Sequence, residues 1–293
     1  MKQSHRIKRA QTSGDECQWA RSTDSQFDGA KKTLILPCLN ASPIDVLKYA
    51  LDLKIPHVIQ STSIDYKRER ESSLLMLRSP RSFLDFPMAT ILDPNQVTEA
   101  TESALSQLDL SFQSSSQKHF VLSQVEEHLL TTDTSTCFRN DLNLVADELF
   151  TNAIFNAKVE GSGNKLLRTE SVNLDYGQRC RIRIAAKGKN LVLVCEDRFG
   201  TLKVEKVLER IRRCYVEGAR QVMTWGPGGA GLGSYMIFEN SMSVYYGVEE
   251  NKRTVIACVF LLAKSARARS GAPKNLHIIE LKDQSSLLRG DAL

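Results

Sequence analysis

The chain contains 293 residues, of which 42% are apolar and 25% charged, and its formal net charge is +5. This length is sufficient for one large domain or two modest domains with hydrophobic cores. No apolar run of about 18 residues is present, and residues 1–10 are basic without the apolar stretch of a secretory signal, so we expect a cytoplasmic protein without a membrane partner. Basic residues alternate with acids, as in residues 67–71, which is typical of a solvated face and argues against nucleic-acid binding.

The cysteines and histidines predict no structural metal site. The seven cysteines are scattered without a CxxC pair, and none of the five histidines is spaced with a cysteine like a zinc ligand. We therefore interpret the cysteines as reduced thiols.

The first part of the chain is predicted to be a tail followed by a small α/β region. Residues 1–31 are polar and poor in aliphatic side chains, which predicts a disordered basic tail. The next elements, in chain order, are a strand at 33–36, a helix at 42–54, a strand at 57–60, an apolar patch at 83–92 and a polar helix at 95–108. We place a region of unassigned role at 32–110 and a Ser/Gln-rich linker at 111–117.

A regular pattern of helices and hairpins follows the linker. The predicted elements are a helix at 118–130, a second helix from 137 to 157, a loop at 160–178, strands at 181–185 and 191–195, a helix at 204–215, a Gly-rich segment, a helix at 234–240, and a closing hairpin of 243–248 with 254–262. This order predicts an α+β layer sandwich with helices on one face of a mixed or antiparallel sheet. It defines a domain at 118–263 and an extension at 264–293, whose apolar run is 276–281.

A polar stripe marks the second of these helices. Glu148, Asn152 and Asn156 fall at i, i+4 and i+8 on one face. Asparagine has poor helix propensity, so two in mid-helix suggest a task for their side chains, although a polar outer face is the alternative. An Asn oxygen is a suitable Mg²⁺ ligand, and a Glu one turn earlier is placed to activate a nucleophile attacking a phosphate.

Two further segments complete a candidate nucleotide pocket. Asp197 ends an apolar strand and precedes Gly200, where its carboxylate can accept a hydrogen bond from an exocyclic amine, or can simply terminate a strand. Residues 226–233 hold five glycines immediately before a helix. Such a backbone can present N–H groups to phosphates, and a hinge or turn is the alternative.

Together, the three segments resemble, in order and spacing, the ATP-binding domain of the GHKL superfamily, which gyrase, a heat-shock chaperone, histidine kinases and mismatch-repair ATPases share. The resemblance covers 118–263 and is closest to the bacterial anti-sigma-factor serine kinases. It implies a Bergerat-type fold that binds ATP and Mg²⁺. The second segment departs from the family, because Gly200 is present but the second glycine of the usual Asp-x-Gly-x-Gly is not.

The resemblance also implies a role for each matching residue. Glu148 corresponds to the catalytic base, with Asp147 as the second choice, and Asn152 to the Mg²⁺ ligand. Asp197 corresponds to the residue that binds adenine, supported by Thr254. The remaining cofactor-binding candidates are Asn156, Gly200, Gly229, Gly231, Leu232 and Gly233, the last four from the lid that closes over ATP.

By this resemblance, the prediction is an ATP-dependent protein serine/threonine kinase that acts on a small partner protein, such as a sigma factor or an anti-anti-sigma-like protein. Homodimerisation is common in this branch, and residues 32–110 are expected to dock partners. A catalytically silent ATP-sensing interaction module is the first alternative. An atypical histidine kinase-like protein is the second, although His119 and His128 lie inside the ATP domain's first predicted helix rather than in an upstream helical hairpin.

Overall fold

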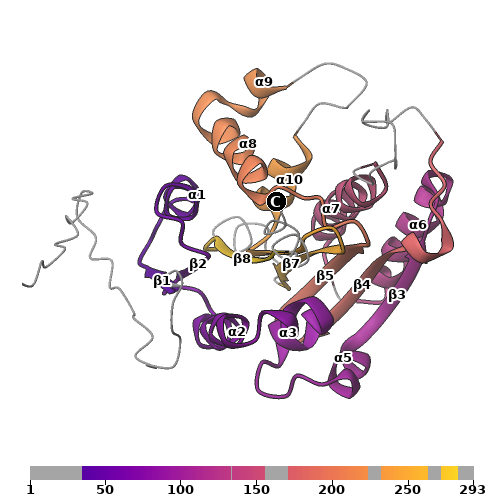
Figure 1. Ribbon diagram of the computed structural model, residues 1–293, viewed down its shortest axis with the longest axis horizontal. Coiled ribbons are helices and arrows are strands. Elements are labelled where there is room, and N and C mark those ends of the chain that lie inside the picture. Colours follow the sequence, from indigo (N-terminus) through magenta and orange to yellow (C-terminus); the bar gives the residue numbers. More distant parts are fainter. Residues whose placement is uncertain (1–34, 133, 156–170, 224–231, 263–271, 283–293) are drawn as a thin grey trace, which may run out of the picture.

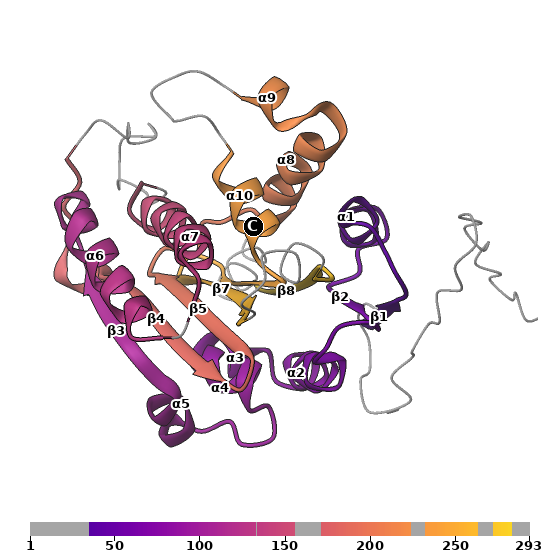
Figure 2. The ribbon, with the colours of Figure 1, turned by 180° about the vertical axis from the view of Figure 1, so that it is seen from behind.

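A computed structural model describes residues 35–132, 134–155, 171–223, 232–262 and 272–282. Within these residues, eight strands form one mixed sheet in the order β1-β2-β8-β6-β7-β5-β4-β3. Figure 1 shows this sheet with helices above and below it, and Figure 2 gives the view from behind.

The elements from Ile35 to Phe112 are a strand–helix–strand unit, four further helices and a third strand. They are β1 (Ile35–Cys38), α1 (Pro43–Asp52), β2 (His57–Gln60), α2 (Tyr66–Arg78), α3 (Pro80–Asp85), α4 (Pro87–Leu92), α5 (Glu99–Leu105) and β3 (Ser106–Phe112). The elements that follow are α6 (Lys118–Leu130), α7 (Thr136–Phe155), β4 (Cys180–Lys187), β5 (Asn190–Asp197), α8 (Val204–Glu217), α9 (Ala219–Val222), α10 (Gly233–Asn240), β6 (Ser243–Glu249), β7 (Arg253–Leu261) and β8 (Asn275–Leu281).

The first βαβ unit forms where the sequence predicts it. Ser42 caps α1, since its Oγ accepts from the Asp45 amide at 3.2 Å while the Asp45 carboxylate accepts from the Ser42 amide at 3.1 Å. Pro43 occupies the first helical turn, where its missing N–H costs nothing. Strands β1 and β2 then pair in parallel, as the crossover through α1 requires.

Strand β3 was not predicted, because the helix was expected to continue to 108 and to be followed by a linker at 111–117. The structure ends α5 at Leu105 and pairs residues 106–112 with β4 as the sheet's edge. The signal was present as a period of two, in which Leu108, Leu110 and Phe112 alternate with polar residues. Strands on both sides of the linker therefore belong to one sheet, and the domain boundaries stay a prediction.

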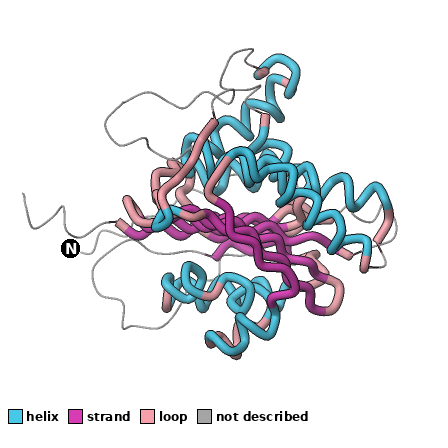
Figure 3. Tube along the Cα trace, turned by 90° about the vertical axis from the view of Figure 1, so that its right-hand side faces the viewer, coloured by secondary structure: helices cyan, strands magenta, loops and turns pink. Residues whose placement is uncertain are grey.

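Helices cover both faces of the sheet, as Figure 3 shows edge-on. Helices α1 and α6–α10 cover one face, which we call the upper face, and α2–α5 cover the lower face. Each interface holds its own apolar core, one packed against α1, α6, α7, α8 and α10 and the other against α2, α3 and α4. The predicted α+β class with a mixed sheet is confirmed. The described helices of residues 118–263 lie on one face as expected, α1 lies on that face with them, and α2–α5 add the second layer.

Strand β8 joins the early part of the chain to the rest of the sheet. It lies between β2 and β6, antiparallel to the first and parallel to the second. The sequence marked 276–281 only as an apolar run, since pairing with two distant strands has no local signal.

A buried polar network lies where β8, β6 and α2 meet. The Glu69 carboxylate on α2 accepts from Tyr245 Oη at 2.5 Å and Ser243 Oγ at 2.7 Å, and lies 3.0 Å from Nε2 of His277 on β8. Burial is the largest single influence and raises the pKa of Glu69, but the hydrogen bond and charge of His277, the charge of Arg68 and the Tyr245 hydrogen bond together lower the pKa to about 2. The network therefore holds an ionised carboxylate in the core and satisfies it with partners from three elements.

Gly247→Ala should destabilise the fold because α3 packs against the bare backbone of β6. A Cβ at Gly247 would lie 2.7 Å from the Phe83 ring and 2.9 Å from a Leu84 methyl. Overpacking of this kind costs roughly 1–3 kcal/mol, which urea denaturation would measure. Gly177→Ala, where nothing lies within 4 Å of the added atom, is the matched control. Equal stability of the two variants would contradict this account of the α3 interface.

Candidate functional site

The first motif lies on α7, which packs across the upper face of β4 and β5. Its apolar side is buried in the upper core, and the Cys195 thiol on β5 donates to the Leu149 carbonyl at 3.6 Å. Glu148 and Asn152 are both half-buried and lie one turn apart on this helix. The packing of α7 thus fixes the height of both side chains above the sheet.

Asp147, the second choice for the base, is already engaged. It forms an ion pair with Lys118 at the start of α6 and accepts a hydrogen bond from the Thr151 hydroxyl at 3.2 Å. Lys118 also donates to the Thr151 hydroxyl at 3.3 Å. These contacts join α7 to α6, so Asp147 has a structural role and Glu148 is the better candidate.

The end of the third motif meets the first. Gly233 opens α10, and a Cβ on it would overlap the Glu148 carboxylate. Gly233, the last residue of the Gly-rich segment, therefore lies directly against the candidate base, and a side chain at this position would require the Glu148 carboxylate to move. Leu232 precedes it, and its carbonyl accepts from the Met236 amide at 2.9 Å, within the first turn of α10. Asn156, Gly229 and Gly231 lie outside the described residues.

The second motif lies on the same face of the sheet as α7. Asp197 pairs in register with Thr254 on β7, and Val248 on β6 is the next residue across. Cross-strand neighbours point to the same face, and Val248 belongs to the upper core. The Asp197 and Thr254 side chains are therefore directed toward the helical layer that holds Glu148, Asn152 and Gly233.

The environment of Asp197 alters its acidity. Burial is the largest influence and raises the pKa of Asp197 to about 6, while hydrogen bonds from the Phe199 and Gly200 amides and from Thr254 oppose that rise. The two amides reach Oδ1 at 2.9 and 3.4 Å. A half-buried carboxylate of this kind gains from an additional hydrogen-bond donor.

Gly200 sets the turn that follows Asp197. Its φ is +60°, and a Cβ would overlap the Glu249 carbonyl oxygen and lie 2.7 Å from the Lys252 amide nitrogen. The Asn251 amide also donates to the Gly200 carbonyl at 3.3 Å. Gly200 therefore acts by stacking its turn on the β6–β7 turn, a contact that motif spacing alone does not reveal.

Three basic residues of the α8 region form ion pairs at the surface. Lys203 lies 3.5 Å from Glu250, Arg212 lies 2.9 Å from Asp52 on α1, and Arg213 lies 2.9 Å from Glu217. Ion pairs of this kind are typical of a solvated helix face rather than of phosphate ligands.

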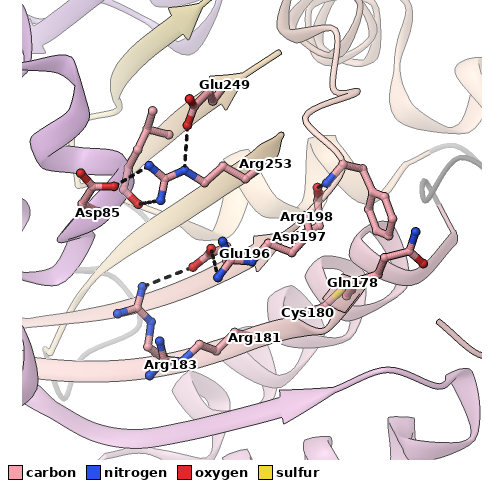
Figure 4. Close-up of polar contacts among 12 residues, drawn as sticks. Asp85, Gln178, Cys180, Arg181, Arg183, Glu196, Asp197, Arg198, Glu249 and Arg253 are labelled. Carbon is pink, nitrogen blue, oxygen red and sulfur yellow. Dashed lines mark hydrogen bonds and ion pairs between the residues drawn. The ribbon is translucent and has the colours of Figure 1, made fainter. Parts of the chain in front are cut away.

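A cavity of about 640 Å³ opens at the Asp197 end of the sheet. Its lining residues are Asp109, Ser111, Tyr176, Gly177, Arg179, Cys180, Arg181, Glu196 and Arg198. None of the predicted site residues lines it. Arg181 pairs with Asp109, and Figure 4 shows Glu196 between Arg183 and Arg198, so its charges are largely compensated by one another.

Comparison with known proteins adds little to this geometry. No family model matches the sequence, and no curated protein matches it. Among solved structures, one chain of the SiaB–SiaC complex from Pseudomonas aeruginosa is similar, with a TM-score of 0.36 and 12% identity, over 64% of this chain and 97% of that chain. A likeness at this level carries no argument about function.

The described residues contain neither a membrane-spanning helix nor a cluster of metal ligands. No helix among them is long and apolar enough to cross a membrane. The same residues contain no group of three or more His, Cys, Asp or Glu side chains that could hold a metal ion.

Gly200→Ala should be more damaging than Gly188→Ala. Both glycines have a positive φ, +60° and +63°, but nothing lies within 4 Å of a Cβ at Gly188. The control therefore measures backbone strain alone, about 1–2 kcal/mol, whereas Gly200→Ala adds a backbone overlap. Chemical denaturation of the two variants would give the difference, and similar losses in both would remove the stacking of the turns as a constraint.

Proposed function

We propose that this protein binds ATP and Mg²⁺ on the upper face of the sheet and transfers the γ-phosphoryl group to a Ser or Thr of a small partner protein. The observation that carries the proposal is the contact between Gly233 and Glu148, which joins two motifs 85 positions apart in the chain (233 minus 148). Asp197, from the second motif, ends the strand beneath α7 and is directed to the same side of the sheet. These relations support the proposal, because the resemblance to the GHKL superfamily implies that the three motifs share one nucleotide site.

The residues present are chemically suited to this cofactor. Asp197 offers a half-buried acceptor at a strand end, suited to an exocyclic amine. Asn152 offers an amide oxygen, a ligand type that Mg²⁺ accepts alongside phosphate oxygens and water. When bound, ATP·Mg²⁺ supplies the phosphoryl group and the charge compensation for its transfer.

Glu148 has the role of general base in this proposal. Its carboxylate accepts the proton of the partner's Ser or Thr hydroxyl as that oxygen attacks. Because Gly233 packs directly on Glu148, the position of the base depends on the backbone that ends the Gly-rich segment. Asn152, one turn further along α7, holds the Mg²⁺ end of the site. Asp197, supported by Thr254, holds the adenine end.

A catalytically silent ATP sensor remains the second candidate. The observation in its favour is the altered second motif, in which Leu202 follows Gly200 and Thr201 where the family usually has its second glycine. A sensor would bind nucleotide through the same residues and lack transfer to any partner.

Asn152→Ala should weaken Mg²⁺-dependent ATP binding. Saturating ATP·Mg²⁺, at about 100 times its dissociation constant, should add roughly 2.7 kcal/mol to the stability of the wild-type protein, seen as a rise in melting temperature. The variant should lose the Mg²⁺-dependent part of this gain. Asn140→Ala, an exposed asparagine on the same helix, should respond as the wild type does. Absence of any ATP·Mg²⁺ effect on the wild type would count against the whole reading.

Glu148→Gln should retain ATP binding and lose phosphoryl transfer by about 10²–10⁴-fold, the usual contribution of a general base. Labelled ATP with candidate partner proteins would measure transfer, and equilibrium binding would measure affinity. Glu127→Gln, on the exposed side of α6, is the control. Transfer that persists in the Glu148 variant would remove this residue as the base, and binding without transfer in the wild type would favour the sensor.

A further inference from the structure

Arg253 at the start of β7 connects the sheet to α3 of the lower layer. Its Nε donates to the Glu249 carboxylate at 3.1 Å, Nη1 to the Leu84 carbonyl at 3.1 Å, and Nη2 to the Asp85 carboxylate at 2.5 Å. Figure 4 shows the guanidinium between Asp85 and Glu249. All three nitrogens are used, and two of the acceptors belong to the C-terminal end of α3, where a cation is favoured.

Glu249 fixes the other end of the same helix. Its carboxylate, on a residue that is 6% exposed, also accepts from Arg81 in the first turn of α3 at 3.1 Å and from Lys252 at 3.0 Å. These contacts lower the pKa of Glu249, although burial opposes them. Helix α3 is thus held at both ends by the Glu249–Arg253 pair, and Phe83 between them packs on the bare backbone of Gly247.

The segment from Glu249 to Thr254 also contacts the candidate adenine-binding residue Asp197, on the face of the sheet opposite to α3. Consecutive strand residues point to opposite faces, so Arg253 is directed down to α3 and Thr254 up beside Asp197. The backbone of residues 249–253 also receives the Gly200 turn, since the Glu249 carbonyl and the Lys252 and Arg253 amides surround the position of its missing Cβ. A displacement of the 249–253 turn therefore moves both the Gly200 turn and Thr254, which are the two contacts that support Asp197.

We propose that Arg253 and Glu249 are positioning residues through which helix α3 sets the geometry of the Asp197 site, so that the lower helical layer controls recognition of the nucleotide base. This inference rests on the proposed nucleotide site. It gives part of the 32–110 region a defined action on that site, since whatever displaces α3 also displaces the turn beneath Asp197.

Two variants test the proposal without touching the pocket. Arg253→Gln removes the charge that links β7 to α3. Asp85→Ala removes one partner of Arg253, and because the Asp85 side chain is 40% exposed, this variant puts folding least at risk. Lys187→Ala is the matched control, because it breaks the 2.6 Å ion pair between the sheet and Asp93 beyond α4. Lys187 lies at the opposite end of β4 and β5 from Asp197.

The first readout compares ATP·Mg²⁺ with inorganic tripolyphosphate·Mg²⁺, which carries the phosphates without the base. Both test variants should weaken ATP binding by about three- to thirtyfold, the range of coupling energies for residues that act at a distance. Tripolyphosphate affinity should stay unchanged, and Lys187→Ala should alter neither ligand. An equal loss for both ligands would show general structural damage and overturn the positioning role.

The second readout is hydrogen exchange of the Phe199 and Gly200 amides in the protein without nucleotide. These amides donate to Asp197, so they should exchange faster in both test variants and at the wild-type rate in Lys187→Ala. Unchanged exchange in the test variants would show that the contacts of Arg253 with α3 do not affect the Gly200 turn, and would overturn the proposal. If the wild type fails to bind ATP while exchange still rises, the proposed function fails and the link from α3 to the turn stands, which distinguishes the two.

Discussion

The insertion of β8 between β2 and β6 is the constraint on which the rest of the structure depends. Through it, the parallel pair β1–β2 becomes part of the same sheet as the antiparallel strands β3–β7. The joint is held by an ionised Glu69 that His277, Tyr245 and Ser243 satisfy in the core. Removing one partner of a buried charge is far more costly than the net gain from the intact network, so this joint favours one register over its alternatives.

The two helical layers follow from this joint. Glu69 belongs to α2, so the strand that completes the sheet also anchors the first helix of the lower layer. Helices α3 and α4 then bury their apolar sides against Tyr245, Val255 and Ala257. The upper face of the same strands packs against α7 and α10. A central strand such as β7 is consequently in contact with both layers, and its consecutive residues contact opposite layers in turn.

Sequence patterns predict the local elements well and their long-range assembly poorly. The α7 stripe, the capped α1 and the two hairpins follow from spacing and capping, which are local properties. Strand β3 was missed because a weak alternation next to a Ser/Gln-rich stretch was interpreted as a linker. Three features depend on residues far apart in the chain: the position of β8, the contact of Gly200 with the 249–253 turn, and the bonds of Arg253 to α3. In the sequence, the segment 249–253 appears only as a charged turn.

The candidate site combines parts that are fixed in different ways. Glu148 and Asn152 are carried by a helix whose apolar side is embedded in the upper core, so their positions change only if that core changes. Asp197 lies at a strand end, where the main supports are Thr254 and the turn stacked under Gly200. The altered second motif is compatible with this support, because the turn is held by contact with the 249–253 backbone at Gly200 and needs no second glycine two residues later. In the proposed nucleotide site, Asp197 is thus the part that contacts between the 249–253 turn and the lower layer can adjust, whereas Glu148 is held by the packing of α7.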